Sequence, residues 1–334
     1  MQLDTGIPEA MSAGGNIVID NLKDYHCEED PNDLYDIRIE RGGFCFSFPL
    51  EKSGIKKKEC LRLWWKDLAR KKNLNHIVNV SEYFKSHDVK YTVKYEYKER
   101  ALKLENGEII PGVVMEWVEG EKLMDYVKKH YRDSLIMKKL AKDFLELALY
   151  MNNRNLAHGD LSGDNIIVRP SGELCLVDYD SFYIDGFTEE IEQTTEGIPC
   201  YQHPERRFNK YLTKSMDYFS QHVIYLSLLV ISEEPNLFRN DIADKGFLFT
   251  KKEICSREIF ENSDIYNNIS KINNSEIQEL LKKLDFFIAG HIESVEPLVV
   301  MNHFFATYCG TCGHHFENQT DLFCPDCGKK RETL

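Results

Sequence analysis

The sequence predicts an α+β chain with a β-rich part, a helical part and a small tail that binds metal through cysteines. Alternating apolar and polar runs, the pattern of half-buried strands, recur between residues 36 and 118. Apolar residues at helical spacing follow between residues 134 and 151, and two C-x-x-C pairs lie near the end. We expect four segments: an accessory segment at 1–34, the β-rich part at 35–118, the helical part at 119–300 and the tail at 306–332.

Composition and charge limit the classes of function. The chain has 334 residues, 42% hydrophobic and 29% charged, which is ordinary for a globular protein. Its net charge of −13 argues against nucleic acid or an anionic membrane as the main partner. The first ten residues have no basic segment and no apolar core, so we expect no secretory signal. The longest apolar stretch, His222–Ile231, is too short to span a bilayer, and we expect a cytoplasmic protein.

Six cysteines lack a pairing pattern, as expected for buried thiols in a reducing compartment. They are Cys27, Cys45, Cys60, Cys175, Cys200 and Cys255.

The first half of the chain reads as a loose or accessory segment followed by strands. Residues 36–40 and 44–48 alternate around Arg41-Gly42-Gly43. Because no G-x-G-x-x-G is present, this turn is either a degraded phosphate-binding loop or a plain β-turn. Residues 60–65 form another alternating run around Arg62, which is either a phosphate ligand or a surface arginine. Ile77, Val80 and Phe84 then predict a helix over residues 74–86.

A second hairpin is expected at Asn106-Gly107, a strong turn dipeptide, after an alternating run from Tyr91 to Tyr97. The next strand is expected to end near residues 114–118. A buried helix over Ser134–Met151 follows and leads into the most informative stretch of the sequence.

That stretch reads H-G-D-L-S-G-D-N from His158 to Asn165 and is followed by V-D-Y-D at residues 177–180. Two β-prone runs flank Pro170-Ser171-Gly172, so a hairpin should bring Asp178 back beside Asn165. Phosphoryl transfer needs one carboxylate near the acceptor hydroxyl. It also needs an amide oxygen and a second carboxylate to hold magnesium. Asp160, Asn165 and Asp178 can supply all three.

The step of five residues from Asp160 to Asn165 matches the kinase loop H-R-D-L-x-x-x-N. His203-Pro204-Glu205 stands where A-P-E closes the activation segment, and Asp217 opens an apolar helix 12 residues later. With these motifs, residues 35–235 resemble the protein kinase-like superfamily, and in particular a divergent, bacterial-type atypical serine/threonine kinase. The resemblance implies a two-lobed fold with a β-rich N-lobe and a helical C-lobe.

The resemblance also implies roles for single residues, with ATP and Mg²⁺ (or Mn²⁺) as cofactors. Asp160 would orient the acceptor hydroxyl, and Asn165 and Asp178 would hold magnesium. Asp217 would brace the catalytic loop, and the same residue would also stand as the N-cap of its helix. The remaining nucleotide contacts would come from Gly42 and Gly43 in the turn, from Arg62 braced by Glu82, from Met115 as the gate of the pocket, and from the backbone of Glu116 and Val118. A solvated Glu82 without that role is an open alternative.

Three departures from the family pattern predict a divergent enzyme. Gly159 replaces the loop arginine, so we expect no control by a phosphorylated activation segment. Ser162 replaces the loop lysine, and Asp180 replaces the D-F-G glycine. The residues after 235 do not match the C-lobe pattern closely.

The tail carries Cys309, Cys312, Cys324 and Cys327, a spacing that predicts a zinc ribbon. A disulfide pair or a redox site is a minor alternative. His314 and His315 are expected to be surface or packing residues, because four cysteines already close the site. Metal binding should contribute folding energy to a tail with so little apolar content.

The sequence as a whole predicts an ATP- and magnesium-dependent protein kinase that recruits a protein substrate or partner through its zinc ribbon. A pseudokinase scaffold and a small-molecule kinase of the aminoglycoside-phosphotransferase type are the alternatives. Membrane binding is not expected. Nucleic-acid binding by the zinc ribbon is a further alternative, which the overall negative charge disfavours, since Lys329–Arg331 is the only basic cluster in the tail.

Overall fold

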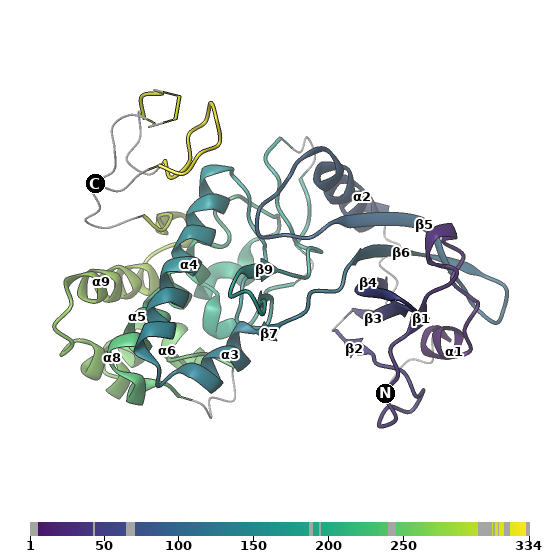
Figure 1. Cartoon of the computed structure of the whole chain (residues 1–334). Coiled ribbons are helices and arrows are strands. Elements are labelled where there is room, and N and C mark those ends of the chain that lie inside the picture. Colours follow the sequence, from purple (N-terminus) through teal and green to yellow (C-terminus); the bar gives the residue numbers. More distant parts are fainter. Residues whose placement is uncertain are drawn as a thin grey trace. The chain divides into compact units, whose positions relative to one another are not determined.

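The computed structural model describes most of the chain, and the chain separates into two compact units, Met1–Glu119 and Gly120–Leu334 (Figure 1). The described residues are 6–42, 44–64, 71–186, 190–193, 195–239, 245–299, 309, 311–312, 314–316 and 321–331, with side chains from residue 74 onward in the helix that begins at residue 71.

The first unit is built on an antiparallel sheet. Its strands are β1 (His26–Cys27), β2 (Glu40–Arg41), β3 (Cys45–Lys52), β4 (Ile55–Trp64), β5 (Tyr95–Lys103) and β6 (Ile109–Glu116). They pair in the order β1-β3-β4-β6-β5, with β2 also on β3. The predicted hairpin at Asn106-Gly107 is confirmed, since Gly107 has a φ of 85° and the Leu104 amide donates to the Glu108 carbonyl.

One helix, α2 (Lys71–Ser86), packs on this sheet and confirms the helix predicted over 74–86. Ile77 and Val80 are buried. The hydroxyl of Ser81 accepts from the Tyr97 amide at 3.0 Å, and the ring of Phe84 lies against that of Tyr95 on β5. The apolar side of the helix is therefore fixed to strand β5.

The amino-terminal segment is not loose, contrary to our expectation. It contains α1 (Ile7–Ser12) and the 3-10 turn η1 (Asp20–Leu22). Ile7, Met11 and Leu22 are buried in the same cluster as Phe48 of β3. Its backbone pairs with β5, where the Val18 amide donates to the Ala101 carbonyl at 3.0 Å. The segment thus forms part of the core of the first unit.

The second unit combines a small antiparallel sheet with helices (Figure 1). The sheet contains β7 (Glu121–Lys122), β8 (Ile166–Val168) and β9 (Leu174–Leu176). Helices α3 (Leu123–His130) and α4 (Ser134–Asn153) precede β8, and α5 (Tyr218–Glu233) is buried along most of its length. Asp133 begins α4 by accepting from two amides of its first turn. The amides of Asn152 on α4 and Gln221 on α5 pair with each other at 2.9 Å.

In the part of the chain after α5 that the structure describes, four α-helices follow, each begun by a side-chain cap of the usual type. They are α6 (Lys251–Ile254), α7 (Arg257–Glu261), α8 (Asp264–Ile269) and α9 (Ser275–Ala289), with Thr250, Ser256, Ser263 and Asn274 as caps. In the part of the chain that the structure describes, no helix has both the length and the apolar character needed to cross a membrane. The predicted combination of an antiparallel-sheet unit, a helical unit and a tail with four clustered cysteines is confirmed.

Candidate functional site

The β8–β9 hairpin aligns the two motifs that carry the predicted site. Ile166 pairs with Leu176, and the Val177 amide donates to the Asn165 carbonyl at 3.0 Å. The Asn165 side chain donates its Nδ2–H to the backbone carbonyl of Asp160 at 2.7 Å. This bond uses the nitrogen of the amide and leaves its oxygen for a ligand.

The His158 side chain contacts the backbone of both motifs. Its Nε2 lies 2.7 Å from the Val177 carbonyl, and its Nδ1 lies 3.3 Å from the Asp160 amide. Since an amide can only donate, Nδ1 accepts and the ring proton is on Nε2. The ring packs edge-to-face against Tyr179 and Phe182. Sequence reasoning gave this histidine no role, although its place at the head of the motif could have suggested one.

Asp217 braces the same loop, as the resemblance implied. Its buried carboxylate accepts from the Gly159 amide at 2.9 Å and from the His158 amide. Asp217 is also the N-cap residue of α5, as predicted, although its side chain makes no hydrogen bond to the first turn of that helix. Two charge-assisted hydrogen bonds therefore fix the loop backbone at the residues before Asp160.

The structure explains why the loop residue is glycine and not arginine. Gly159 has a φ of 82°, and a Cβ there would stand 2.1 Å from the carbonyl oxygen of Ser181. An arginine does reach this loop from elsewhere: Arg206, only 2% exposed, donates to the Gly159 carbonyl at 2.7 Å and to the Met216 carbonyl at 3.0 Å. It also donates to the Gln193 side chain at 2.8 Å. Sequence reasoning missed Arg206, because no spacing rule connects it to the loop.

The electrostatics of Asp160 suit a proton acceptor. Burial raises the pKa of this carboxyl to about 6, and the nearby carboxylate of Asp178 acts in the same direction, while His158 and Arg206 oppose both. A carboxylate with a pKa near neutrality matches the requirement for general base catalysis. The backbone of Asp178 itself adopts a φ of 70°, which is rare for a residue other than glycine. Such backbone strain is common at functional sites.

The expected end of the activation segment is anchored in the second unit. The Glu205 carboxylate accepts from the Ile292 amide at 2.9 Å and lies 3.0 Å from His291 Nδ1. These bonds lower the pKa of Glu205. The His203 ring lies 2.9 Å from the Phe287 carbonyl at the end of α9.

In the first unit, Arg62 is buried and Glu82 is not its partner. Arg62 lies at 7% exposure on β4, in register with Ser47 and Val113, so the alternative of a surface arginine is wrong. The Glu82 side chain is 65% exposed and pairs with Lys85 at 2.9 Å. The predicted Arg62–Glu82 contact is therefore not formed, because α2 turns Ile77 and Val80 toward the sheet and Glu82 toward solvent.

The other predicted nucleotide contacts lie at the ends of strands. Gly42 donates its amide to the Cys45 carbonyl at 2.9 Å in the turn between β2 and β3, while Gly43 lies outside the described residues. Met115 and Glu116 end β6. Met115 is buried, Glu116 pairs with Lys57 at 2.8 Å and Val118 is half-buried. Their roles toward a nucleotide stay predictions.

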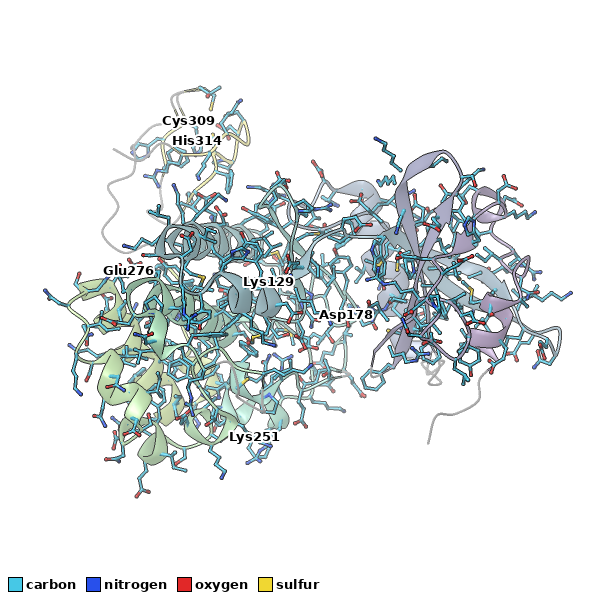
Figure 2. All side chains as sticks on the ribbon, turned by 60° about the horizontal axis from the view of Figure 1, so that its bottom comes forward. Lys129, Asp178, Lys251, Glu276, Cys309 and His314 are labelled. Atoms are coloured by element: carbon cyan, nitrogen blue, oxygen red, sulfur yellow. The ribbon has the colours of Figure 1, made fainter. Side chains whose placement is uncertain are left out.

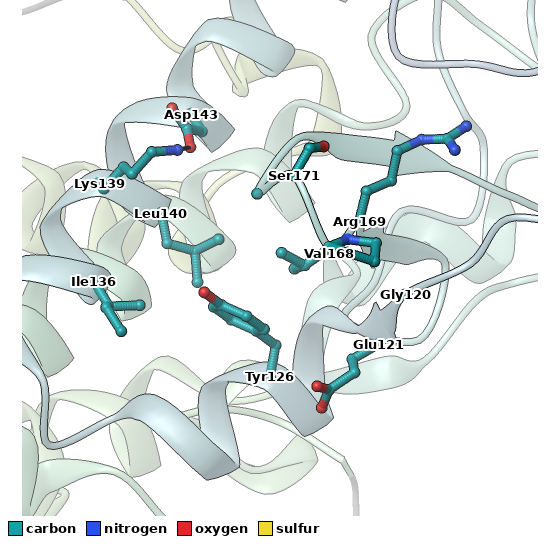
Figure 3. A pocket seen from close by; sticks show the side chains of 12 residues that line it. Gly120, Glu121, Tyr126, Ile136, Lys139, Leu140, Asp143, Val168, Arg169 and Ser171 are labelled. Atoms are coloured by element: carbon teal, nitrogen blue, oxygen red, sulfur yellow. Dashed lines mark hydrogen bonds and ion pairs between the residues drawn. The ribbon is translucent and has the colours of Figure 1, made fainter.

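A cavity of about 420 Å³ lies elsewhere in the second unit (Figure 3). Tyr126, Ile136 and Leu140 line it on α3 and α4, and the β8–β9 turn lines it opposite. Its Lys139 and Asp143 pair with each other. None of the predicted site residues lines this cavity.

Comparison with known proteins agrees with the geometry. Residues 65–285, about two thirds of the chain, match the family model of the protein kinase domain. The chain belongs to the protein kinase family. The match continues past residue 235, so the expected extent of the resemblance is too short at its carboxyl end. It begins after β4, so Arg62 and the glycine turn precede the matched part.

Curated relatives are kinases that are much longer than the matched segments. The CBL-interacting serine/threonine-protein kinase 21 of Arabidopsis thaliana is 30% identical over 35% of this chain and 28% of its own length. The calcium-dependent protein kinase 6 of Plasmodium berghei is 32% identical over 36% of this chain and 8% of its own. The serine/threonine-protein kinase pak-1 of Caenorhabditis elegans is 27% identical over 39% of this chain and 23% of its own length. The matched part of this chain thus covers 28% or less of the length of each.

The tail of the kinase brings its four cysteines together. Their sulfur atoms all lie within 4.8 Å of one another, with Cys309 and Cys327 at 3.6 Å and Cys312 and Cys324 at 3.4 Å. Tetrahedral Zn–S bonds of about 2.3 Å require S···S distances of about 3.8 Å, so the cluster fits one zinc ion. Backbone amides of Cys312 and Thr311 lower the pKa of Cys309 to about 6, which favours the thiolate that binds metal.

The surroundings of the cluster agree with a closed metal site. Gly328 has a φ of 69° in the turn after its cysteine pair, while Gly313 lies outside the described residues. His314 lies in the same small tail as Cys309 (Figure 2), but it contacts Asp326 at 2.8 Å and packs on Phe316 instead of joining the cluster. Among the described tail residues, the apolar cluster is only Phe316 with two of the cysteines.

The basic cluster of the tail is engaged within the kinase itself. Lys330 pairs with Glu146 on α4, and the Phe323 ring meets the Tyr150 ring edge-on at 6.0 Å. The Arg331 guanidinium lies 4.2 Å from the centre of the Phe316 ring. Two of the three basic residues are therefore used in intramolecular contacts.

Of the six cysteines expected to be buried thiols, none forms a disulfide among the described residues, and only Cys255 is exposed.

Proposed function

We propose that this chain is an ATP- and magnesium-dependent protein kinase of divergent type that phosphorylates serine or threonine. The observation that carries the proposal is the hydrogen-bonded frame that holds Asp160, Asn165 and Asp178 next to one another. The frame is supported by His158 and Asp217 and is independent of the missing loop arginine. Two of the relatives are serine/threonine-protein kinases, which favours the same acceptor class.

The donor set fits the cofactor. Asn165 offers an amide oxygen and Asp178 a carboxylate, the hard oxygen ligands that magnesium takes beside nucleotide phosphates. Bound magnesium neutralises charge on the transferred phosphoryl group. Asp160, with its pKa near 6, accepts the proton of the acceptor hydroxyl. Arg62 and the turn at Gly42 and Gly43 contact phosphate, and the end of β6 (Met115, Glu116, Val118) contacts the base.

Transfer of labelled phosphate from ATP tests the proposal. The wild-type chain, incubated with magnesium and γ-labelled ATP, incorporates label into itself or into casein, and Asp160→Asn loses nearly all of this signal. Equal incorporation by the two proteins refutes the assigned role of Asp160. No incorporation by the wild-type chain refutes the enzyme.

A pseudokinase scaffold is the second candidate, because Glu82 faces solvent and an arginine stands in place of the strand lysine. Arginine is not geometrically equivalent to lysine at a phosphate. Such a scaffold binds ATP without transferring label. Nucleotide binding measured in parallel with the transfer assay separates the two candidates.

We further propose that the tail binds one zinc ion and recruits a protein partner in the cytoplasm. The exposed positions of Cys312 and Cys327 leave one side of the cluster open to such a partner. Loss of a co-purifying partner on deletion of residues 306–332, with transfer activity retained, is the expected result. Retention of every partner by the truncated chain contradicts it.

A further inference from the structure

The structure contains a buried glutamine whose amide lacks a partner. Gln202 precedes His203-Pro204-Glu205 in the activation segment and is 4% exposed. Among the described residues, neither its side-chain nitrogen nor its oxygen makes a hydrogen bond. An amide buried in this way costs free energy of folding and needs a reason.

The environment of this amide indicates the reason. A Cβ on Gly197 would stand 2.6 Å from Gln202 Nε2 and 2.9 Å from Asp160 Oδ1. The amide and the carboxylate therefore both lie beside Gly197, whose φ of 76° also suits glycine. Asp160 Oδ1 is itself buried and has no hydrogen-bond donor among the described residues.

Two other polar side chains near Asp160, Arg206 and His158, already make hydrogen bonds elsewhere. The Arg206 guanidinium donates to the Gly159 and Met216 carbonyls and to Gln193. His158 uses Nε2 on the Val177 carbonyl and Nδ1 on the Asp160 amide. The Ser162 hydroxyl, in place of the loop lysine, is buried and also makes no hydrogen bond among the described residues, but it is not one of the atoms nearest to Gly197. The Gln202 amide is thus a side-chain donor without a hydrogen bond among the described residues that lies beside the same glycine as Asp160 Oδ1.

We propose that Gln202 is a positioning residue for Asp160: its Nε2–H holds Asp160 Oδ1, so that the second carboxylate oxygen faces the acceptor hydroxyl. This inference rests on the proposed function. A rotation of the Gln202 side chain closes the remaining gap when nucleotide and acceptor bind. The activation segment then orients the Asp160 carboxylate through a neutral amide, and it does so without being phosphorylated.

An isosteric variant separates positioning from folding. Gln202→Met keeps the length of the side chain and removes both amide atoms, while Gln202→Glu keeps the shape and places a second carboxylate against Asp160. The matched control is Gln221→Met, since Gln221 is equally buried but paired with Asn152 and distant in sequence from the catalytic loop. The four proteins are compared, as full chains, for melting temperature and for labelled-phosphate transfer to casein.

For Gln202→Met we expect kcat to fall about tenfold or more, with KM for ATP within twofold and a melting temperature at or above that of wild type. Gln202→Glu loses more activity than Gln202→Met. Gln221→Met shows the opposite pattern, with a lower melting temperature and an unchanged kcat, because it breaks a satisfied buried pair.

Two results overturn the inference alone. One is a wild-type kcat for Gln202→Met in a chain whose transfer still depends on Asp160. The other is a fall in melting temperature for Gln202→Met as large as that for Gln221→Met, which assigns Gln202 a structural role. Absence of transfer by the wild-type chain is a different failure, since it removes the proposed function and this inference with it.

Discussion

Replacing Asp160 by asparagine should make the kinase inactive and more stable. The carboxyl has a folded-state pKa of about 6 against an ordinary value of 3.8. The folded state therefore binds this proton more tightly than the unfolded state, and the contribution of Asp160 to stability falls as the pH rises from 3.8 to 6. Above pH 6 the ionised carboxylate costs about 1–3 kcal/mol, since each pH unit of difference corresponds to about 1.4 kcal/mol. Asparagine keeps the shape and removes that cost.

Urea unfolding in magnesium-free buffer at two pH values measures this effect. We expect Asp160→Asn to raise the free energy of unfolding by about 1–3 kcal/mol at pH 8 and by about one third of that at pH 4.5. The control is Asp125→Asn, because the Asp125 side chain is 54% exposed and should give no gain. An Asp160→Asn protein that is less stable than wild type at pH 8 refutes the reasoning.

Three further perturbations follow from the contacts. Asp217→Ala leaves the buried amides of His158 and Gly159 without an acceptor. The free energy of unfolding, measured by urea titration, should therefore fall by about 2–5 kcal/mol. An unchanged urea midpoint contradicts the proposed role of Asp217 in fixing the loop. Gly159→Arg restores the family residue yet should cost about 2–5 kcal/mol, because a Cβ meets the Ser181 carbonyl; a stable, more active variant contradicts this account. Metal analysis should find one zinc per chain in the wild type and none in Cys324→Ser, with faster proteolysis of the tail, and equal zinc content in both contradicts the assignment.

The parts of the site that the sequence predicted are those fixed by local spacing. Asn165 and Asp178 flank a hairpin whose turn residues and β-prone runs are contiguous, so their approach follows from local rules. The four cysteines of the tail are likewise brought together by two short turns. Such elements depend little on the rest of the chain.

The residues that sequence reasoning missed act through contacts between distant segments. Arg206 donates to a carbonyl 47 positions earlier in the chain, and Gln202 approaches a carboxylate 42 residues before it. The apolar residues of the amino-terminal segment are short runs that become buried only against strands formed later in the sequence. The periodic patterns of the sequence do not predict these contacts.

Helix phase explains the incorrect Glu82 prediction. The sequence indicated the helix but not whether Glu82, its one carboxylate, would face β4, and a step of one residue turns a side chain by about 100°. Ser81 faces the sheet and bonds the Tyr97 amide, while Glu82 is directed to solvent. The short helices α6 to α8 were missed for a different reason, because their Ser/Thr caps were present but their apolar patterns are only a few residues long.

Magnesium-dependent nucleotide binding tests the central claim most directly, that Asn165 and Asp178 hold a metal–nucleotide complex beside Asp160. Thermal unfolding is followed with ATP, with magnesium and with both, in the wild type and in Asp178→Ala. We predict that ATP with magnesium raises the melting temperature of the wild type by several degrees, as expected for a ligand well above its Kd. Asp178→Ala should lose the part of this shift that requires magnesium. A wild-type shift that is absent, or that is identical with and without the metal and in the variant, contradicts the account.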